Sequence, residues 1–120
     1  MDRTFIFVGA LAGFLGVALG AFGAHFLKAR LSTEMLAVFE TGVRYHLIHA
    51  VAILATAALM GRASARLLTA AGWFFTGGII LFSGSLYLLA FTGITVLGAI
   101  TPLGGLAFLA AWACLLIAAI

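Results

Sequence analysis

Residues that carry charge or form cross-links are scarce in this chain. Charged side chains make up only 8% of the 120 residues, and only three of them are acidic. The single cysteine, Cys114, excludes an internal disulfide and any metal site built from several cysteines. No charged residue follows Arg66, so the C-terminal part lacks the carboxylates that a proton pump or coupled carrier needs along its path. The six basic residues are scattered singly, and we expect no nucleic-acid partner and no cofactor.

Apolar side chains dominate instead. They make up 66% of the chain, and the mean hydropathy is +1.33. A soluble domain of this length cannot bury so much apolar surface. We therefore expect the lipid bilayer to be the partner that surrounds the chain. Four apolar runs, each near the length that a membrane-spanning helix needs, cover residues 5–27, 43–60, 67–91 and 102–120. We therefore expect an all-α fold, a four-helix transmembrane bundle forming one membrane domain over residues 1–120.

The ends of these runs bear on processing and orientation. The small residues of GAFGA (residues 20–24) resemble a signal-peptide cleavage site. However, the first run is longer than the apolar core of a signal peptide, and the start MDR (residues 1–3) is only weakly basic. We expect the first helix to be retained. Arg3, Arg62 and Arg66 flank one side of the predicted bundle, against Lys28 and Arg30 on the other. The positive-inside rule then favours both termini in the cytoplasm.

A polar stretch precedes the second run. Ser32 or Thr33 can cap a helix, and Glu34 suits its first turn. Residues 33–42 combine apolar side chains with the acidic Glu34 and Glu40, which predicts an amphipathic interfacial segment before helix 2, with a bend possible near Gly42. A straight helix from Thr33 to Met60 would be about 42 Å long and would exceed the hydrocarbon core of about 30 Å. On the outward side of this stretch, the i,i+4 spacing of Glu40 and Arg44 predicts an ion pair.

Small residues form two matching stripes at spacings of three and four. Membrane helices approach closely where such residues line up. We expect the two stripes to pack against each other, although one of them could instead serve a homo-oligomer or simply reflect an alanine- and glycine-rich composition. The stripe of the first run consists of Gly9, Gly13, Gly16, Gly20 and Gly23, and that of the fourth run of Gly104, Ala107, Ala111, Cys114 and Ala118.

The few polar side chains at membrane depth gather in TGVRYHLIHA, residues 41–50, and in the third run. A helical wheel places Tyr45, His46 and His49 on one face. The third run should return beside the second across the short loop of residues 61–66, so residues equidistant from that loop share a depth. We expect one polar pocket or network at the end opposite this loop, made of His25, Tyr45, His46, His49, Ser83, Ser85 and Tyr87.

Besides the proton path excluded above, two kinds of chemistry and one structural role could use this cluster. His46 and His49, with His25 as a third ligand, are weak candidates for a metal site, because no further Cys or Asp stands nearby. Ser83 or Ser85 beside a histidine could supply the nucleophile and base of a hydrolase, but Glu40 faces away and cannot orient the base. The third reading is structural, with His, Tyr and Ser joined by interhelical hydrogen bonds of about 0.6 kcal/mol each. In that reading the histidines are neutral.

Four stretches resemble one family along almost the whole chain: GALAGFLGVALGAFGAHFL, TGVRYHLIHAVAIL, FSGSLY and TPLGG. The family is that of the domain of unknown function 423, small membrane proteins with bacterial members and a mitochondrial relative in animals. The resemblance implies a four-span inner-membrane protein and no established activity. It also implies that the family's signature positions are Gly20, Gly23, His25, Tyr45, His46, His49, Ser83, Gly84, Ser85, Tyr87, Thr101, Pro102, Gly104 and Gly105.

Two classes of function remain open, and we expect neither to be an enzyme. The first is a structural or accessory membrane protein that acts through helix contacts in a homo-oligomer or a larger membrane complex. Its small size and the lack of charge inside the membrane favour this class. The second is a small transporter, or a bundle that binds a ligand or lipid at a polar site in the non-cytoplasmic leaflet. The polar cluster at one end favours this one.

Overall fold

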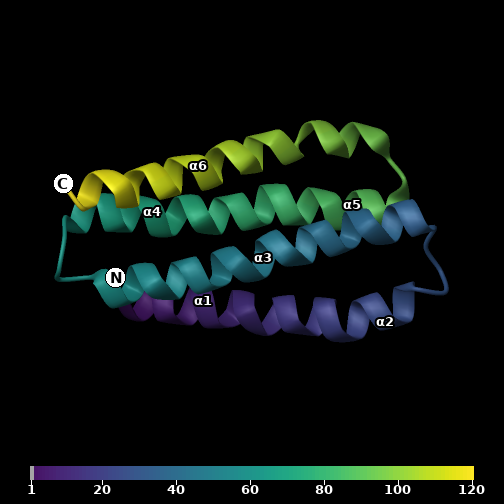
Figure 1. Ribbon diagram of the computed structural model, residues 1–120, viewed down its shortest axis with the longest axis horizontal. Coiled ribbons are helices and arrows are strands. Elements are labelled where there is room, and N and C mark those ends of the chain that lie inside the picture. Colours follow the sequence, from purple (N-terminus) through teal and green to yellow (C-terminus); the bar gives the residue numbers. More distant parts are fainter. Residues whose placement is uncertain (1) are drawn as a thin grey trace.

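The structure, a computed structural model, describes residues 2–120, which form four long helices and no strand. Each is long and apolar enough to cross a membrane. The spans alternate in direction, so both ends of the chain and the loop between the second and third spans lie at one end of the bundle (Figure 1). The predicted all-α, four-span architecture is confirmed. The bounds are Asp2–Leu27, Thr33–Leu59, Ala65–Thr92 and Thr95–Ala118.

The first and third spans each contain a wider π-helical turn. The first span consists of α1 (Asp2–Val17), the π-turn η1 (Ala18–Gly23) and α2 (Ala24–Leu27). The third consists of α4 (Ala65–Gly78), the π-turn η2 (Ile79–Ser83) and α5 (Gly84–Thr92). Such turns insert an extra residue into the helix and are frequent at functional sites. Here η2 ends at Ser83, one of the polar residues singled out from the sequence.

The second span is a single helix, α3 (Thr33–Leu59), which continues through Gly42. The Ser32 side chain caps it by accepting a hydrogen bond from the Met35 amide at 3.1 Å. The amphipathic segment predicted for residues 33–42 is therefore the first part of the spanning helix, and the helix is not interrupted between the two. At about 1.5 Å per residue α3 is roughly 40 Å long, so about 10 Å of it extends beyond a hydrocarbon core of about 30 Å.

The connections are short and use the residues that end and begin helices. Gly61 and Gly93 adopt positive φ values of 85° and 72°, which glycine tolerates without strain at the end of a helix. Ser64 caps α4 by accepting from the Leu67 amide. The fourth span begins with the 3₁₀ helix η3 (Thr95–Ala99) and continues as α6 (Thr101–Ala118), with Pro102 in its first turn.

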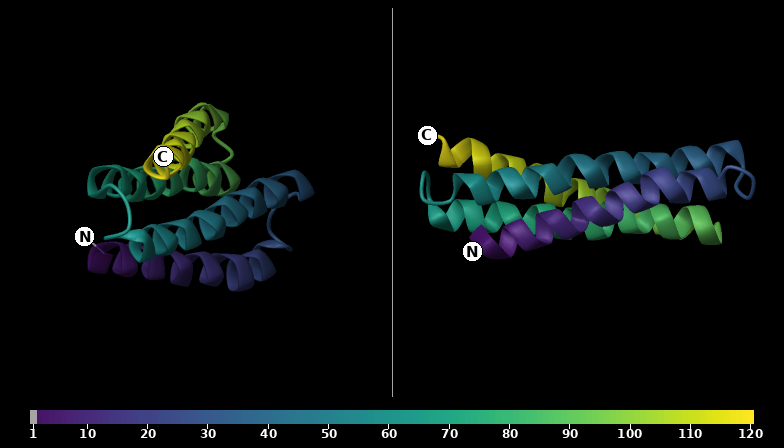
Figure 2. Two further views of the ribbon diagram at one scale, coloured as in Figure 1. Left: turned by 60° about the vertical axis from the view of Figure 1, so that its left-hand side comes forward. Right: turned by 90° about the horizontal axis from the view of Figure 1, so that it is seen from below.

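The four spans follow one another in chain order across the bundle. Figure 2 shows the first span beside α3, and α6 on the far side of the third span. The first and fourth spans therefore occupy opposite edges. A core of Phe5, Ile53, Phe75 and Phe108 with smaller residues fills one end, and Phe39 with Val43 and Ala90 fills the other.

The predicted pairing of the two small-residue stripes is wrong. Gly9, Gly16, Gly20 and Gly23 face α3, where the side chains nearest to them are Leu54, Leu47, Val43 and Phe39. Gly13 has open space beside it, and Gly104 packs on Phe82 of the third span. Ala111 is fully buried, and Ala107, Cys114 and Ala118 are half-buried. Small residues show which face approaches a neighbour closely but not which neighbour it is, and short loops favour the adjacent span.

Candidate functional site: two histidine networks

His46 joins three spans through its two ring nitrogens. Its Nε2 lies 2.8 Å from the Ala12 carbonyl oxygen of α1, and its Nδ1 lies 2.8 Å from the Tyr87 hydroxyl of α5. A carbonyl can only accept, so Nε2 carries the hydrogen. In the neutral ring Nδ1 then accepts from the Tyr87 hydroxyl. Gly16 makes this approach possible, because a Cβ there would lie 3.2 Å from His46 Cδ2.

His49 joins α3 to α6 and has the opposite tautomer. Its Nδ1 lies 2.7 Å from the Tyr45 carbonyl oxygen and therefore donates. The indole N–H of Trp112 donates to His49 Nε2 at 3.1 Å, which requires that nitrogen to be unprotonated. The His49 ring also stacks on Phe108, with 3.6 Å between ring centroids and an angle of 6° between the planes. His49 is thus a neutral ring between two aromatic side chains of α6.

Ser83 and Ser85 form hydrogen bonds between the third span and its neighbours. The Ser83 hydroxyl donates to the Gly42 carbonyl oxygen of α3 at 2.7 Å. The Ser85 hydroxyl donates to the Phe82 carbonyl oxygen at 2.9 Å, so the Thr101 hydroxyl at the start of α6 donates to Ser85 Oγ at 2.6 Å. Gly42 also lets Tyr87 lie against α3, because a Cβ there would be 2.8 Å from Tyr87 Cε1.

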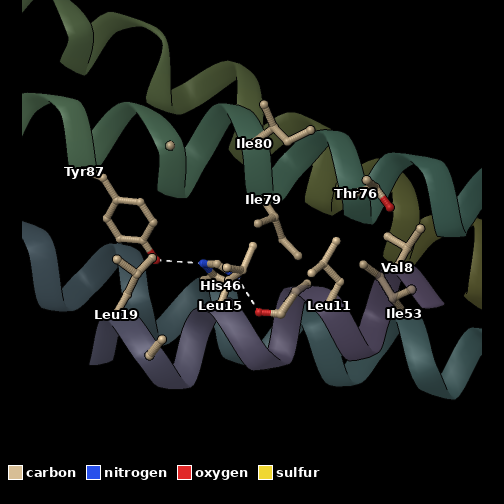
Figure 3. Close-up of a pocket in the computed structure, with 13 residues that line it drawn as sticks. Val8, Leu11, Leu15, Leu19, His46, Ile53, Thr76, Ile79, Ile80 and Tyr87 are labelled. Atoms are coloured by element: carbon tan, nitrogen blue, oxygen red, sulfur yellow. Dashed lines mark hydrogen bonds between the residues drawn. The ribbon is translucent and has the colours of Figure 1, made fainter. Parts of the chain in front are cut away.

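The two histidines line different grooves. The first groove has a volume of about 600 Å³ and lies between the first and third spans, with His46 and Tyr87 among mostly aliphatic side chains. Figure 3 shows the His46 ring beside the Tyr87 hydroxyl, with Leu11 and Ile79 on the side of His46 away from Tyr87. The second groove, of about 560 Å³, lies between α3 and α6. It is lined by Tyr45, His49, Phe82, Pro102, Gly105, Leu106, Phe108, Leu109 and Trp112.

The single pocket predicted from the sequence is thus two networks, one around each histidine. Residues at i,i+3 differ by about 60° around a helix, which directs His46 towards the first and third spans and His49 towards α6. Every buried side-chain nitrogen and oxygen of residues 2–120 has a hydrogen-bond partner. The buried polar groups of the two networks are therefore engaged with one another or with backbone carbonyls.

His25 lies outside both networks, contrary to the prediction. It stands on the exposed side of α2, and its ring packs edge-on against Phe26 with 6.3 Å between centroids. The prediction placed His25 with the cluster by its depth at the end of the first span, and depth does not define the face of a helix. The π-turn η1, which directly precedes α2, also changes the face on which His25 lies.

Tyr45 takes part only through its ring and its backbone. The ring lies 4.6 Å from that of Phe82 between centroids, and 39% of the residue is exposed. Within residues 2–120 the structure records no hydrogen bond to the Tyr45 hydroxyl. That hydroxyl remains available at the second groove.

The predicted Glu40–Arg44 ion pair is also absent from the described part of the chain. Both residues are exposed on α3, and the structure records no ion pair or hydrogen bond to either side chain. An exposed pair contributes little, because holding two long side chains in one geometry costs conformational entropy. The nearby Thr41 hydroxyl instead donates to the Ala37 carbonyl oxygen of its own helix.

A metal site on these histidines has no geometric support. Residues 2–120 contain no group of three His, Cys, Asp or Glu side chains close enough to hold a metal ion. The unprotonated nitrogen of each buried histidine already accepts a hydrogen bond, so no ring lone pair is left for an ion. His25, His46 and His49 do not converge.

Sequence reasoning missed Trp112 and Phe108 as members of the His49 network. Apart from the weak thiol donor of Cys114, Trp112 is the only side-chain hydrogen-bond donor within α6 after Thr101. An indole N–H in a membrane seeks an acceptor, so this was a usable signal. The acceptor could be identified only once the helices that neighbour α6 were known, and the wrong pairing of the two small-residue stripes had placed α6 beside the first span.

Comparison with known proteins relates almost the whole chain to one family of membrane proteins. The model of a family described as "Protein of unknown function (DUF423)" matches residues 19–105. The UPF0382 membrane protein YwdK of Bacillus subtilis is 47% identical over 119 residues, which cover 98% of this chain and 97% of the relative. A UPF0382 membrane protein of Staphylococcus haemolyticus is 44% identical over 115 residues, covering 96% and 93%. The UPF0382 inner membrane protein YgdD of Escherichia coli is 40% identical over 119 residues, covering 99% and 91%. No solved structure matches the chain.

Proposed function

The chain belongs to this family of unknown function (DUF423), which names no activity, and we propose that the protein is an accessory membrane component acting through helix contacts. Its partners are a second copy or the helices of a larger membrane complex. One observation carries the proposal: the buried side-chain nitrogens and oxygens of residues 2–120 are all hydrogen-bonded within the chain. Polar groups at membrane depth that serve a substrate or a proton path would keep bonding capacity for it.

The hydrogen bonds of the serines argue against an enzyme. A serine nucleophile needs a histidine base within hydrogen-bond reach. Ser83 donates to a backbone carbonyl, Ser85 bonds Phe82 and Thr101, and both ring nitrogens of His46 and His49 have other partners. The names of the relatives describe membrane proteins and no catalytic activity.

The grooves favour a second candidate, a bundle that binds a lipophilic ligand. The first groove has the volume of a small-molecule site, about 300–1,000 Å³. Its polar side chains, His46, Thr76 and Tyr87, already bond within the protein. A polar solute would therefore find few partners there, which weakens the transporter reading and leaves lipids as occupants.

We place the protein in the cell inner membrane with both termini in the cytoplasm. Support comes from Arg62 and Arg66, which lie in or beside the loop at the end where the chain begins and stops (Figure 1). A Ser64→Cys variant in a Cys114→Ala background should resist a membrane-impermeant thiol reagent in intact cells and react after lysis. Ready labelling in intact cells would reverse the orientation.

Photo-crosslinking in living cells tests the accessory role. A photoreactive phenylalanine analogue replaces Phe14 or Phe22, which are 73% and 67% exposed, or as control Phe5, which is fully buried. The proposal predicts protein adducts of discrete mass at one or both exposed positions and none at Phe5. Only lipid adducts at both, with a monomer as the sole species in native mass spectrometry, would contradict it.

A further inference from the structure

The second groove is the size of a lipid chain. We call it the aromatic groove, after the five aromatic rings among its lining residues Tyr45, His49, Phe82, Phe108 and Trp112. From Pro102 to Trp112 it follows α6 for about 15 Å, which is half of a hydrocarbon core of about 30 Å. One turn of α-helix, roughly 10 Å across and 5.4 Å long, occupies on the order of 400 Å³. A groove of about 560 Å³ is therefore too small to enclose a spanning helix, whereas an extended hydrocarbon chain fits along it.

Tyr45 provides one hydrogen-bonding group at this groove that the protein leaves unused. The indole N–H of Trp112 and both nitrogens of His49 are engaged, whereas the Tyr45 hydroxyl has no partner within residues 2–120. A phenol donates one hydrogen bond. An occupant with a carbonyl oxygen near the groove would satisfy it.

Arg44, the neighbouring residue, lacks a counter-ion. It is exposed, and the structure records no ion pair for it among residues 2–120. At about 1.5 Å per residue, Arg44 lies roughly 22 Å from the Leu59 end of α3, some 8 Å inside the far boundary of a core of about 30 Å. An arginine at that depth extends its side chain to the headgroup level, where an anion stabilises it.

We propose that the aromatic groove binds one anionic phospholipid from the leaflet opposite the loop of residues 61–66. One acyl chain lies along Phe108 and Leu109, the ester carbonyl accepts from the Tyr45 hydroxyl, and the phosphate pairs with the Arg44 guanidinium. The net negative charge of the headgroup matters because a zwitterionic lipid brings its own cation to the phosphate. This site does not depend on the proposed accessory role and could be absent without affecting it.

Native mass spectrometry of the purified full-length protein in mild detergent tests the site. The probes are phosphatidylglycerol and phosphatidylcholine with identical dioleoyl chains. We expect one phosphatidylglycerol per chain, bound about tenfold more tightly than phosphatidylcholine, as loss of one charge-assisted hydrogen bond implies. Arg44→Gln should remove this preference, and the matched control Arg62→Gln, at the other end of the bundle, should keep it.

A second pair of variants tests the groove itself. In Gly105→Leu the new side chain should fill the aromatic groove. A Cβ at this position meets nothing closer than 4.0 Å, so the protein should still fold while its affinity for both lipids falls. Tyr45→Phe should weaken both lipids about threefold. Equal binding of the two lipids by the unaltered protein, a preference that survives Arg44→Gln, or unchanged binding by folded Gly105→Leu would each overturn the proposal.

Discussion

The two helix hairpins of this protein achieve close packing in different ways. In the N-terminal hairpin, formed by the first span and α3, the closest contacts of the glycines on the first span are with side chains, such as Leu47 Cδ2 at 2.6 Å from a Cβ placed on Gly16. In the C-terminal hairpin, the third span with α6, Gly104 meets the backbone of Phe82 and Gly78 meets the ring of Phe108. A flexible side chain can move aside, but a helix backbone cannot. The C-terminal hairpin should therefore be the less tolerant of the two.

The largest effect is expected at Gly104. In Gly104→Ala the new methyl group would overlap the backbone nitrogen and Cα of Phe82, which forces α6 away from the third span. We expect a loss of about 3 kcal/mol in the free energy of unfolding, at the upper end of overpacking effects, measured by denaturant titration in detergent micelles.

Gly105→Ala is the matched control for this substitution. Its Cβ would meet only Phe82 Cδ2, at 4.0 Å, so stability should stay the same or rise slightly. Equal losses at the two neighbouring positions would mean that the helix itself, and not its contact with Phe82, sets the cost.

The next effect concerns the network that ties the N-terminal hairpin to the third span. His46→Ala leaves the Tyr87 hydroxyl without its acceptor and removes the bond to Ala12, which should cost about 2 kcal/mol. A double-mutant cycle with Tyr87→Phe should give a coupling of about 1 kcal/mol.

Trp112 provides the comparison for that cycle, because it bonds His49 and not His46. The cycle of His46→Ala with Trp112→Phe should show no coupling beyond about 0.5 kcal/mol. A large coupling there would show that the two networks behave as one pocket after all.

The smallest effect compares two glycines of α1. Gly16→Ala should cost about 1 kcal/mol, because Leu47 must shift to admit the methyl group. Gly13→Ala meets nothing within 4 Å and should instead stabilise the helix by about 0.8–1 kcal/mol. The same unfolding titration measures both, and a loss at Gly13 as large as that at Gly16 would point to a contact of Gly13 with another molecule.

The spans and their alternation were predictable because both follow from length and hydropathy, which are local properties of the chain. The Ser32 cap was predictable for the same reason. The partner of each small-residue stripe was not, since the spacing of Gly9, Gly16 and Gly20 defines a face without defining its neighbour.

The polar cluster was predictable in membership more than in arrangement. The rule that residues equidistant from the loop share a depth placed Ser83 and Tyr87 level with residues 41–46, where Ser83 bonds Gly42 and Tyr87 bonds His46. The rule could not show that the cluster forms two separate networks. His46 and His49 differ by about 60° around α3, and this difference assigns them to different neighbours only once the positions of the first span and α6 are known. The π-turns η1 and η2 also rotate the helical faces of the residues that follow them, and no residue pattern in the sequence predicted either turn.

The central claim is that His46 and His49 are neutral rings in opposite tautomers, each held by partners from a different set of spans. Nitrogen NMR of selectively ¹⁵N-histidine-labelled protein in micelles reads both ring nitrogens directly, with His46→Gln and His49→Gln variants to assign the signals. The predicted result at neutral pH is a protonated Nε2 on His46 and a protonated Nδ1 on His49. The same tautomer at both positions, or a cationic ring at either, would contradict the account.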